Sequence, residues 1–308
     1  MKKSMVLALA AVMAAGLLAG CGSKETTGGA ATEPTKAPQT EEASDAGDTQ
    51  GEAEASTKEG QAEDAGTENG PAQEGQDGAV SEVLADGVLT VGTNAEFPPF
   101  EYVDDNGQPD GFDIALIKAI GEKLGVEVQV ENMEFDSLVA SIGSKVDVAI
   151  AGMTVTEERA ASVDFSDSYY DALQYVVVAE GSEIATAEDL VGKTIGVQLG
   201  TTGDFIATDD IEGTTVSQYS KAVDAVNDLI NGRVDCVIID KNPALVFESK
   251  FEGQVKALDG AQFDFGVEQY AIALPKGDAA LAEQINSALE EIKGDGTFDE
   301  LVKTYIEN

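Results

Sequence analysis

One arginine is conspicuous in this 308-residue chain because arginine is so scarce in it. The sequence has sixteen lysines and only two arginines, and one of these, Arg159, follows an apolar run at residues 146–151. A guanidinium holds a carboxylate through two parallel hydrogen bonds, which an ammonium cannot do. Arg159 is therefore a candidate for binding a carboxylate. The alternative is an ordinary surface ion pair with Asp164 or Glu158, and the sequence favours neither.

A residue of opposite charge follows a second apolar run. Asp240 comes directly after residues 234–239, where it can accept hydrogen bonds from an ammonium group or cap the helix expected near Asn242. The segment GTTG at 200–203 offers backbone N–H groups to an anion, although threonine is also a common helix cap. An arginine and amides for a carboxylate, with an aspartate for an ammonium, describe a site for an α-amino acid.

Alternating strands and helices must position these residues. Apolar spacing at Leu116, Ile117, Ile120 and Leu124 is typical of a helix, and period-two alternation at 126–130 of a half-buried strand. The expected strands are 89–93, 126–130, 146–151, 175–179, 194–198, 234–239 and 270–274. The expected helices are 114–124, 135–142, 221–231, 242–250, 279–293 and 297–306. This order predicts two α/β units with mostly parallel sheets.

Ligands of open α/β sheets bind beyond the carboxyl ends of the strands. Four strand ends carry unusual residues, two in each unit: NAEFPPF (94–100), AGMT (151–154), QLGTTG (198–203) and Asp240. Two units facing each other across a cleft would bring them together. The similar segments SKVDVAI (144–150) and GRVDCVI (232–238) fit two related units, or two independent solutions to one helix-to-strand turn.

The first 80 residues differ from the rest of the chain. Residues 1–20 combine two lysines, an apolar stretch and the small residues before Cys21, as in a cleaved lipoprotein signal peptide. The alternative is an ordinary signal with an incidental cysteine. Residues 21–80 have 14 acidic residues and three lysines but no aromatic, Leu, Ile or Met. Such a segment cannot offset its ordering entropy, so we expect a disordered acidic tether before a folded unit at 81–308.

Composition excludes several functions. The chain contains no histidine, which weakens any hypothesis of an imidazole base or a histidine-ligated metal, and we expect no metal or cofactor. Besides Cys21 the only cysteine is Cys236, which we expect to be buried. A net charge of −40 argues against nucleic-acid binding, which needs clustered Lys and Arg. Its simplest interpretation is solubility.

The folded unit resembles the bacterial extracellular solute-binding proteins of family 3, the amino-acid receptors of ABC importers. The resemblance rests on six segments in family order: GFDIALIKAI (111–120), VDVAIAGMTVTEER (146–159), VDFSDSYY (163–170), GVQLGTTG (196–203), GRVD (232–235) and YAIALPKG (270–277). One departure is Ala115, where the family usually has a second acid. It puts the hydrogen bonding of the first helix in doubt.

The resemblance implies a two-lobed periplasmic-binding fold of type II with a two-strand hinge. The first lobe would contain about 83–175 and 271–308, and the second about 176–270. It also implies that Arg159 and the backbone near Thr202 hold the ligand carboxylate. Thr154, the Gly152 carbonyl and Asp240 would hold the ammonium group. The implied side-chain contacts are Phe97 and Phe135, which without the family would be taken as core, and less directly Asn94, Glu96 and Gln198.

We therefore expect a monomeric import receptor, not an enzyme, that is anchored in the membrane through lipidated Cys21 and delivers an amino acid, polar or basic, to permease subunits. Two alternatives are a sensory protein and a dehydratase-like enzyme of the cyclohexadienyl or arogenate type. A sensor would normally add a transmembrane helix and a signalling domain. An enzyme would need a general acid or base in the cleft, for which Glu96 is the candidate.

Overall fold

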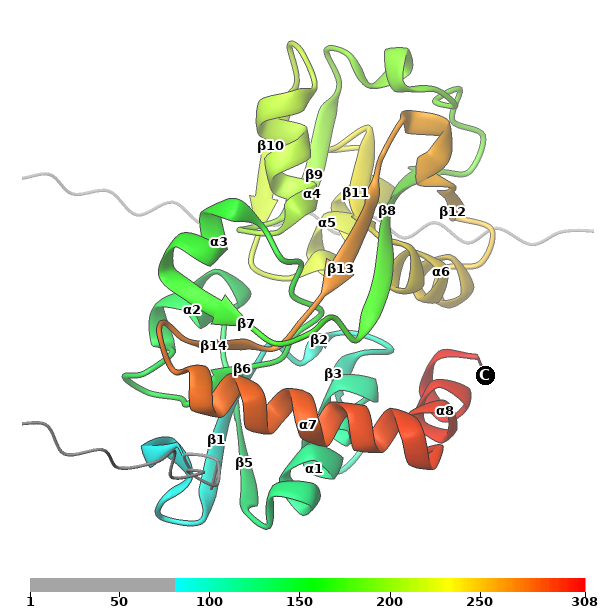
Figure 1. Cartoon of the computed structure of the whole chain (residues 1–308). Coiled ribbons are helices and arrows are strands. Elements are labelled where there is room, and N and C mark those ends of the chain that lie inside the picture. The colour runs from blue at the N-terminus through cyan, green and yellow to red at the C-terminus, as the bar shows by residue number, and fades with distance from the viewer. Residues whose placement is uncertain (1–80, 308) are drawn as a thin grey trace, which may run out of the picture. The chain divides into compact units, whose positions relative to one another are not determined.

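The computed structural model describes residues 81–307, so the predicted signal peptide, Cys21 and the tether lie outside the described residues. Figure 1 shows two sheets, each covered by helices, with long strands passing between them. We call the elements around the sheet that contains β1 the first lobe, and those around the sheet that contains β9 the second lobe. Among residues 81–307 no helix is both long and apolar enough to cross a membrane.

The first lobe is built on a five-stranded sheet. Its strand order is β5 (Glu127–Asn132), β1 (Val88–Thr93), β6 (Val148–Ala149), β14 (Ala273–Pro275) and β7 (Val163–Phe165). Its helices are α1 (Phe112–Leu124), α2 (Leu138–Ser141), α3 (Glu157–Ser162), α7 (Ala279–Asp295) and α8 (Thr297–Leu301). Beside them lies a small sheet of β2 (Glu96–Phe97), β3 (Glu101–Val103) and β4 (Pro109–Asp110).

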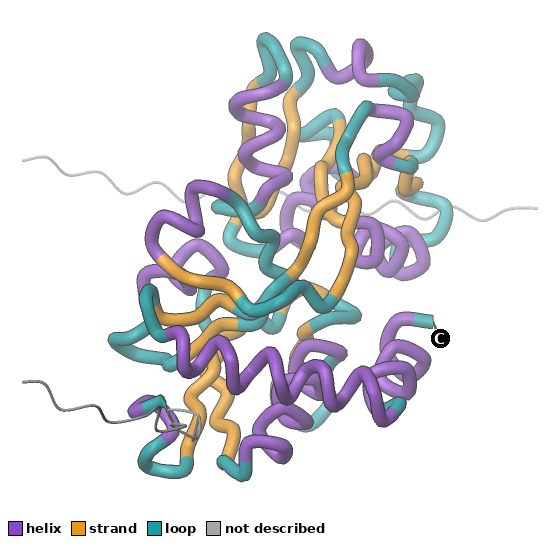
Figure 2. Tube along the Cα trace, viewed as in Figure 1, coloured by secondary structure: helices purple, strands orange, loops and turns teal. Residues whose placement is uncertain are grey.

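The second lobe has its own sheet with a mixed pattern. Its order is β10 (Thr215–Tyr219), β9 (Thr194–Gln198), β11 (Cys236–Asp240), β8 (Tyr170–Ala179) and β12 (Val255–Leu258), and β13 (Val267–Tyr270) also pairs with β8. Its helices are α4 (Thr202–Phe205), α5 (Ala222–Ile230) and α6 (Lys241–Lys250). Figure 2 shows the same division of helices and strands along the chain trace.

Burial explains the regular elements. In α1, Leu116, Ile117 and Ile120 are fully buried on one face, and the helix ends at Gly125, whose φ of 73° allows the left-handed cap. In β1, Leu89 and Val91 are buried in alternation. Cys236 is buried in the second-lobe core, as predicted, and burial raises the pKa of its thiol to about 12. The apolar pattern therefore specifies the core of each lobe.

The sheets are less parallel than the sequence predicts. β1 is parallel to β5 and β6, and β9 to β10 and β11, but β14 is antiparallel to β6 and β7. β8 is antiparallel to β11, β12 and β13. The difference arises because β8 and β13 connect the lobes in opposite directions. The expected strand at 270–274 is correspondingly divided between β13, which follows β8, and β14, which joins the first sheet.

The similar segments around two Val-Asp pairs form the same local structure. The Asp147 carboxylate accepts from the Thr90 N–H at 2.7 Å, and the Asp147 N–H donates to the Thr90 carbonyl at 2.9 Å. Asp235 makes the same two bonds with Thr194, at 2.8 and 2.7 Å. Although both lobes share these bonds, β6 covers only Val148–Ala149 of the strand expected at 146–151, whereas β11 runs over five residues, Cys236–Asp240.

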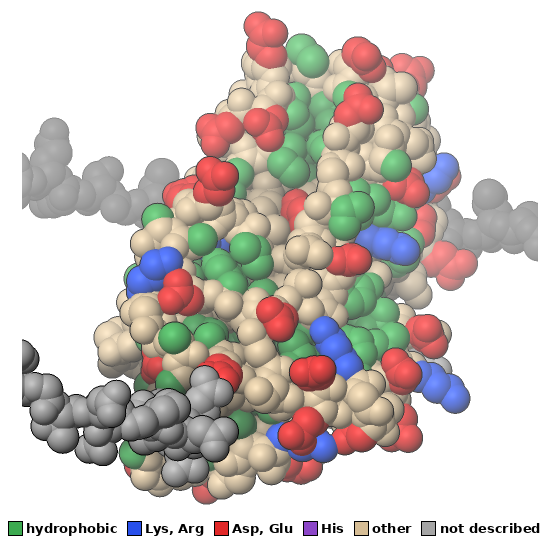
Figure 3. Space-filling view, in the orientation of Figure 1, with side chains coloured by type: hydrophobic (Ala, Val, Ile, Leu, Met, Phe, Trp, Pro, Cys, Tyr) green, Lys and Arg blue, Asp and Glu red, His purple; other side chains and the backbone are tan. Residues whose placement is uncertain are grey.

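Acidic side chains dominate the surface. Figure 3 shows Asp and Glu side chains scattered over the visible face of both lobes, with few Lys or Arg between them. This distribution agrees with the overall excess of 58 acidic over 18 basic residues. No basic patch able to neutralise a run of phosphates is seen on that face.

Candidate functional site

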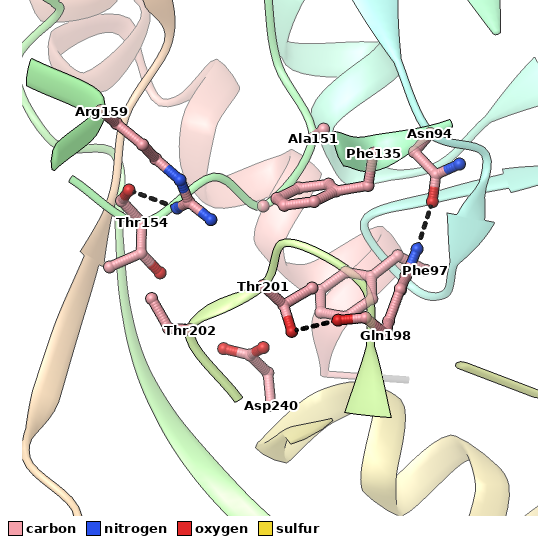
Figure 4. Close-up of a pocket in the computed structure, with 11 residues that line it drawn as sticks. Asn94, Phe97, Phe135, Ala151, Thr154, Arg159, Gln198, Thr201, Thr202 and Asp240 are labelled. Atoms are coloured by element: carbon pink, nitrogen blue, oxygen red, sulfur yellow. Dashed lines mark hydrogen bonds between the residues drawn. The ribbon is translucent and has the colours of Figure 1, made fainter. Parts of the chain in front are cut away.

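The four strand ends singled out in the sequence meet at one pocket. Figure 4 shows its side chains, which come from both lobes. Its empty space is about 300 Å³, including the part open to solvent. The lining contains every predicted ligand contact except Glu96, together with Ala151 and Thr201; it consists of Asn94, Phe97, Phe135, Ala151, Gly152, Thr154, Arg159, Gln198, Thr201, Thr202 and Asp240.

Arg159 lies on α3, which begins after Thr156, whose hydroxyl accepts the Arg159 N–H. Its side chain is buried and donates to the Thr154 carbonyl at 2.6 Å and to the Gly200 carbonyl of the second lobe at 2.9 Å. The Phe135 ring lies 5.4 Å from the guanidinium carbon. These contacts fix the plane of the guanidinium toward the pocket, as a bidentate grip requires.

The arginine has no ion-pair partner in the described part of the chain. No carboxylate of residues 81–307 approaches it within ion-pair distance, and Asp164, the alternative partner, pairs instead with Lys276 at 2.7 Å. Burial lowers the pKa of Arg159, and the negative charges of Glu268 and Asp240 partly offset this effect. A buried cation of this kind can bind an anion with little competition from water.

Asp240 lies at the carboxyl end of β11, a strand buried along its whole length. Its Oδ1 accepts from the Tyr270 hydroxyl at 2.6 Å. Its side chain makes no capping hydrogen bond to α6. The carboxylate of Asp240 therefore does not serve as the helix cap that the sequence left open as an alternative. Burial, and then repulsion from Glu268, raises the pKa of Asp240 to about 7. A cationic group in the pocket would favour its ionised form.

The loop at Gly152 is held in place by a hydrogen bond to Asp113 of α1. Gly152 has a φ of 52°, and a Cβ there would lie 3.0 Å from the Phe97 ring. Its N–H donates to Asp113 Oδ2 at 2.7 Å, and the Tyr169 hydroxyl donates to the same oxygen at 2.7 Å. Asp113 is on α1, which begins regularly at Phe112 with Ala115 bonded to Gly111 at 2.9 Å. The departure at Ala115 therefore leaves this helix intact.

A second buried acid supports Asp113. Glu101 is fully buried on β3, and burial followed by repulsion from Asp113 raises its pKa well above the usual range. Burial also raises the pKa of Asp113, to about 6, although its bonds to Gly152 and Tyr169 oppose this. The charge of Asp113 therefore disfavours a second negative charge on Glu101 beneath the pocket.

The other end of the pocket is uncharged. Phe97 is buried and Phe135 is half-buried, and Figure 4 shows both rings among the lining residues. Gln198 Nε2 donates to Asn94 Oδ1 of the other lobe at 2.8 Å, and Asn94 Nδ2 donates to the Met133 carbonyl at 2.8 Å. These amides close the pocket with polar but neutral groups.

Glu96 does not line the pocket. Its Oε1 accepts from Lys221 Nζ, in the second lobe, at 2.5 Å. This ion pair neutralises the charge on which a preference for basic ligands, and a role as a general acid or base, had been based. Asn94 and Gln198, which were predicted with Glu96 as side-chain contacts, line the pocket, whereas Glu96 does not.

Two further polar groups lie at or beside the site: Thr201, which is part of the predicted GTTG segment, and Glu268, which the sequence reasoning missed. Thr201 caps α4 by accepting from Asp204 N–H at 3.2 Å and donates to the Gln198 carbonyl at 2.8 Å. Glu268 on β13 contacts two predicted ligand residues, Thr154 and Thr202. Glu268 and Tyr270 are two positions apart, so they share one face of the strand. That spacing was the available signal, but the expected strand began at residue 270.

Comparison with known proteins gives consistent matches over this region. The family model described as bacterial extracellular solute-binding proteins, family 3, matches residues 89–308. A probable histidine-binding protein of Neisseria gonorrhoeae is 30% identical over 75% of this chain and 88% of its own length. An arginine-binding extracellular protein of Bacillus subtilis is 35% identical over 70% of this chain and 85% of its own.

Solved structures agree with the sequence matches. An ancestral arginine-binding protein bound to arginine superposes with a TM-score of 0.66 at 44% identity, over 71% of this chain and 98% of its own. An ancestral arginine-binding protein bound to glutamine gives a TM-score of 0.68 at 44% identity, over 72% of this chain and 99% of its own. At this identity the likeness supports the same two-lobed α/β fold.

Proposed function

Because the chain belongs to the bacterial extracellular solute-binding proteins of family 3, we propose that it binds a free α-amino acid between its lobes and presents it to the permease of an ABC importer. The observation that carries this proposal is Arg159. It is a buried cation at a pocket that also contains Asp240, and no carboxylate of residues 81–307 forms an ion pair with it.

The proposed pose follows from the charges. The ligand carboxylate binds the Arg159 guanidinium and the backbone N–H of Thr202, which is at the first turn of α4 and has no intrahelical acceptor there. The ammonium group binds Asp240, Thr154 and the carbonyl of Gly152. Two fixed charges of opposite sign, each already oriented by neighbouring groups, favour a zwitterion over a simple acid or amine.

We propose a ligand with a polar or basic side chain. The side chain would extend between Phe97 and Phe135 toward Asn94 and Gln198, where aromatic faces and amide oxygens suit a guanidinium or a carboxamide. Proteins similar to this chain are named for binding histidine and arginine, and ancestral arginine-binding proteins were solved with arginine and with glutamine. These ligands share a planar polar group at the end of the side chain.

We propose binding without catalysis. The relatives are binding proteins, and Glu96, the residue considered as a general acid or base, is paired with Lys221 outside the pocket. Incubation with prephenate or arogenate should leave both unchanged. Formation of phenylpyruvate or phenylalanine would instead support the dehydratase alternative.

The test is a thermal-shift screen against the common L-amino acids, followed by calorimetry on those that stabilise. A ligand present at 100 times its Kd stabilises by about 2.7 kcal/mol, which for a domain of this size raises Tm by roughly 5–10 °C. The D-enantiomer is the matched control, since it cannot place both α-groups on their partners. A flat screen across all amino acids would overturn the proposal.

Membrane attachment through Cys21 is a separate proposal, which rests on the sequence pattern at 1–21, and we further propose that the protein acts as a monomer. We expect Cys21→Ser to abolish lipid labelling and to release the exported protein from the membrane fraction, because the thioether-linked lipid needs the cysteine sulfur. Metabolic labelling with palmitate measures this directly, and Cys236→Ser is the matched control. Undiminished labelling of Cys21→Ser would contradict the anchor.

A further inference from the structure

Glu101 is a completely buried carboxyl that the proposed ligand pose does not use. It lies on β3, opposite Phe97 of β2, and neither Glu101 nor Asp113 of α1 is exposed to solvent. The two carboxyls lie within hydrogen-bonding reach of each other. Asp113 in turn accepts from the N–H of Gly152, which lines the pocket. Glu101 therefore reaches the pocket only through Asp113.

Hydrogen bonds distinguish the two carboxyls. Asp113 Oδ2 accepts from the Gly152 N–H and from the Tyr169 hydroxyl, both at 2.7 Å. Among residues 81–307, no donor bonds Asp113 Oδ1 or either oxygen of Glu101. Donated hydrogen bonds stabilise an ionised carboxylate. The negative charge is therefore favoured on Asp113 and disfavoured on Glu101.

A proton on Glu101 supplies the missing donor. The charges that act on Glu101 are those of Asp113 and, more weakly, Asp240, and both are negative. Glu101 in turn helps to raise the pKa of the Tyr169 hydroxyl, so an ionised tyrosine is disfavoured beside it. A protonated carboxyl has one O–H group to donate. Its bond to Asp113 Oδ1 satisfies that oxygen and uses the proton of Glu101.

We propose that Glu101 is a positioning residue that stays protonated at neutral pH, donates to Asp113 Oδ1 and, by keeping Asp113 ionised, holds the Gly152 loop at the pocket. The protonation of Glu101 concerns the folded domain alone. Its effect on ligand binding rests on the proposed function, because the Gly152 carbonyl is placed there against the ligand ammonium.

Infrared difference spectroscopy tests the proton directly, because the C=O stretch of a carboxylic acid is separate from the bands of carboxylates. At about pH 7.5 the exposed acidic side chains are ionised. We expect wild type to show a carboxylic-acid band that Glu101→Gln lacks. The matched control is Glu131→Gln, an exposed residue of β5, which should keep the band. Any contribution from Asp240 is common to all three proteins.

The pH dependence of stability gives a second measurement. Glu101 ionises in the unfolded chain above its ordinary pKa of 4.5 but stays protonated in the folded chain, so wild type loses stability as pH rises between these two pKa values. The amide of Glu101→Gln has no such proton. We expect the Tm of Glu101→Gln relative to wild type to rise by roughly 3–5 °C per pH unit between about pH 5 and 7. Glu131→Gln should show no trend.

Either of two results would overturn the inference. An ionised Glu101, bonded for example to water, gives no band that depends on residue 101 and no trend in the Tm difference. Failure of Glu101→Gln to fold would also contradict the inference, because the amide keeps the size of the side chain and an N–H donor for Asp113 Oδ1.

Glu101→Met tests the positioning role, since it keeps a similar volume but removes the donor. Asp113 Oδ1 is then buried beside no donor, so we expect a Tm roughly 3–10 °C below that of Glu101→Gln. The Kd of L-arginine or L-glutamine, whichever wild type binds more tightly, should rise by about three- to tenfold in Glu101→Met. In Glu101→Gln it should change by less than about threefold.

The comparison of the two variants is decisive because burial alone favours methionine over glutamine. A Glu101→Met protein as stable and as tight-binding as Glu101→Gln would overturn the positioning role. Unfolding of Glu101→Met alone, with Glu101→Gln folded, would support it, since the donor is the difference between them.

Failure of the proposed function looks different. A wild-type protein that binds no amino acid contradicts that function, yet the infrared band and the Tm trend need no ligand and still decide the protonation of Glu101. If wild type binds an amino acid and the band is absent, the inference about Glu101 fails while the proposed function stands.

Discussion

The two ends of the pocket differ in how their polar groups are fixed. At one end Arg159 and Asp240 are buried charges, each held by hydrogen bonds to carbonyls or to a tyrosine. At the other end Asn94 and Gln198 bond to each other beside two phenylalanines. The charged end suits the groups that all amino acids share, and the neutral end suits the part that varies. The groups that recognise any amino acid and the groups that choose among amino acids therefore lie at different ends of the pocket.

The largest effect is expected at the charged end. Arg159→Lys keeps the charge but loses the planar fork that bonds Thr154 and Gly200 while facing the pocket. We expect the Kd of every amino acid that binds to rise by about 30-fold or more, since disrupting a buried charged pair costs about 2–5 kcal/mol. Calorimetric titration with the ligand found by screening measures this.

The second arginine provides the control. Arg233 is exposed and pairs with Asp228 on the surface, so Arg233→Lys should leave the Kd unchanged and alter stability by about 0–1 kcal/mol. If Arg159→Lys binds like wild type, the carboxylate does not bind at the guanidinium and the division between the two ends is wrong.

The next effect is a loss of affinity in acid. The pKa of Asp240 is raised to about 7, and the ammonium group needs the ionised carboxylate. As pH falls below that value, the carboxyl must first lose its proton, so affinity weakens by up to roughly tenfold per pH unit. Above pH 8 the carboxylate is already ionised, and affinity should be flat until the ligand ammonium itself titrates.

Titrations at pH 8 and pH 5.5 test this expectation, with roughly ten- to thirtyfold weaker binding at the lower pH. Tyr270 donates to Asp240, and Glu268, Arg159, Glu101 and Tyr170 also interact with its charge. Asp240→Asn removes the titrating group, so its weaker binding should lose most of the pH dependence. A wild-type affinity that is independent of pH in this range would mean that Asp240 does not hold the ammonium group.

The sequence predicts the charged end of the site better than its surroundings. Asp240 and Thr202 follow the neighbouring strands β11 and β9 of the second sheet, whose ends lie together whatever the loop details, and Arg159 follows a strand of the first sheet. The core of each lobe is predicted for a similar reason, since burial dictates its pattern. The conformation of Gly152 and the pairing of Glu101 with Asp113 depend instead on contacts between distant segments.

Residues on the hinge were the hardest to predict. Glu268 reaches Thr154 and Thr202, which line the pocket, only because β13 pairs with β8 and Thr154 forms a bridge to Tyr270. The two-residue spacing of Glu268 and Tyr270 is a weak local signal, because the four residues 267–270 are too few to show a clear alternation. Glu96 shows the opposite case. Asn94 and Phe97 line the pocket, whereas the Glu96 side chain pairs with Lys221 of the other lobe, a contact between distant segments that the sequence does not reveal.

The smallest expected effect concerns the ion pair between Lys221 and Glu96. It tests which groups select the ligand side chain at the neutral end of the pocket. Lys221 and Glu96 have side chains that are 43% and 27% exposed, and such pairs contribute about 0–1 kcal/mol. Lys221→Met should therefore alter the Kd of any ligand by less than about fivefold. The direction of this change is informative, however, because the variant leaves the charge of Glu96 uncompensated next to Phe97, which lines the pocket.

That charge should attract a cationic side chain and leave a neutral one unaffected. We expect Lys221→Met to raise the preference for L-arginine over L-glutamine by about two- to threefold, and high salt to reduce the gain through screening. The double variant with Glu96→Gln should restore the wild-type preference, since no net charge is left. If the preference stays the same in Lys221→Met at low salt, Glu96 has no influence on the ligand, and the selection of the side chain rests on Asn94, Gln198 and the two phenylalanines alone.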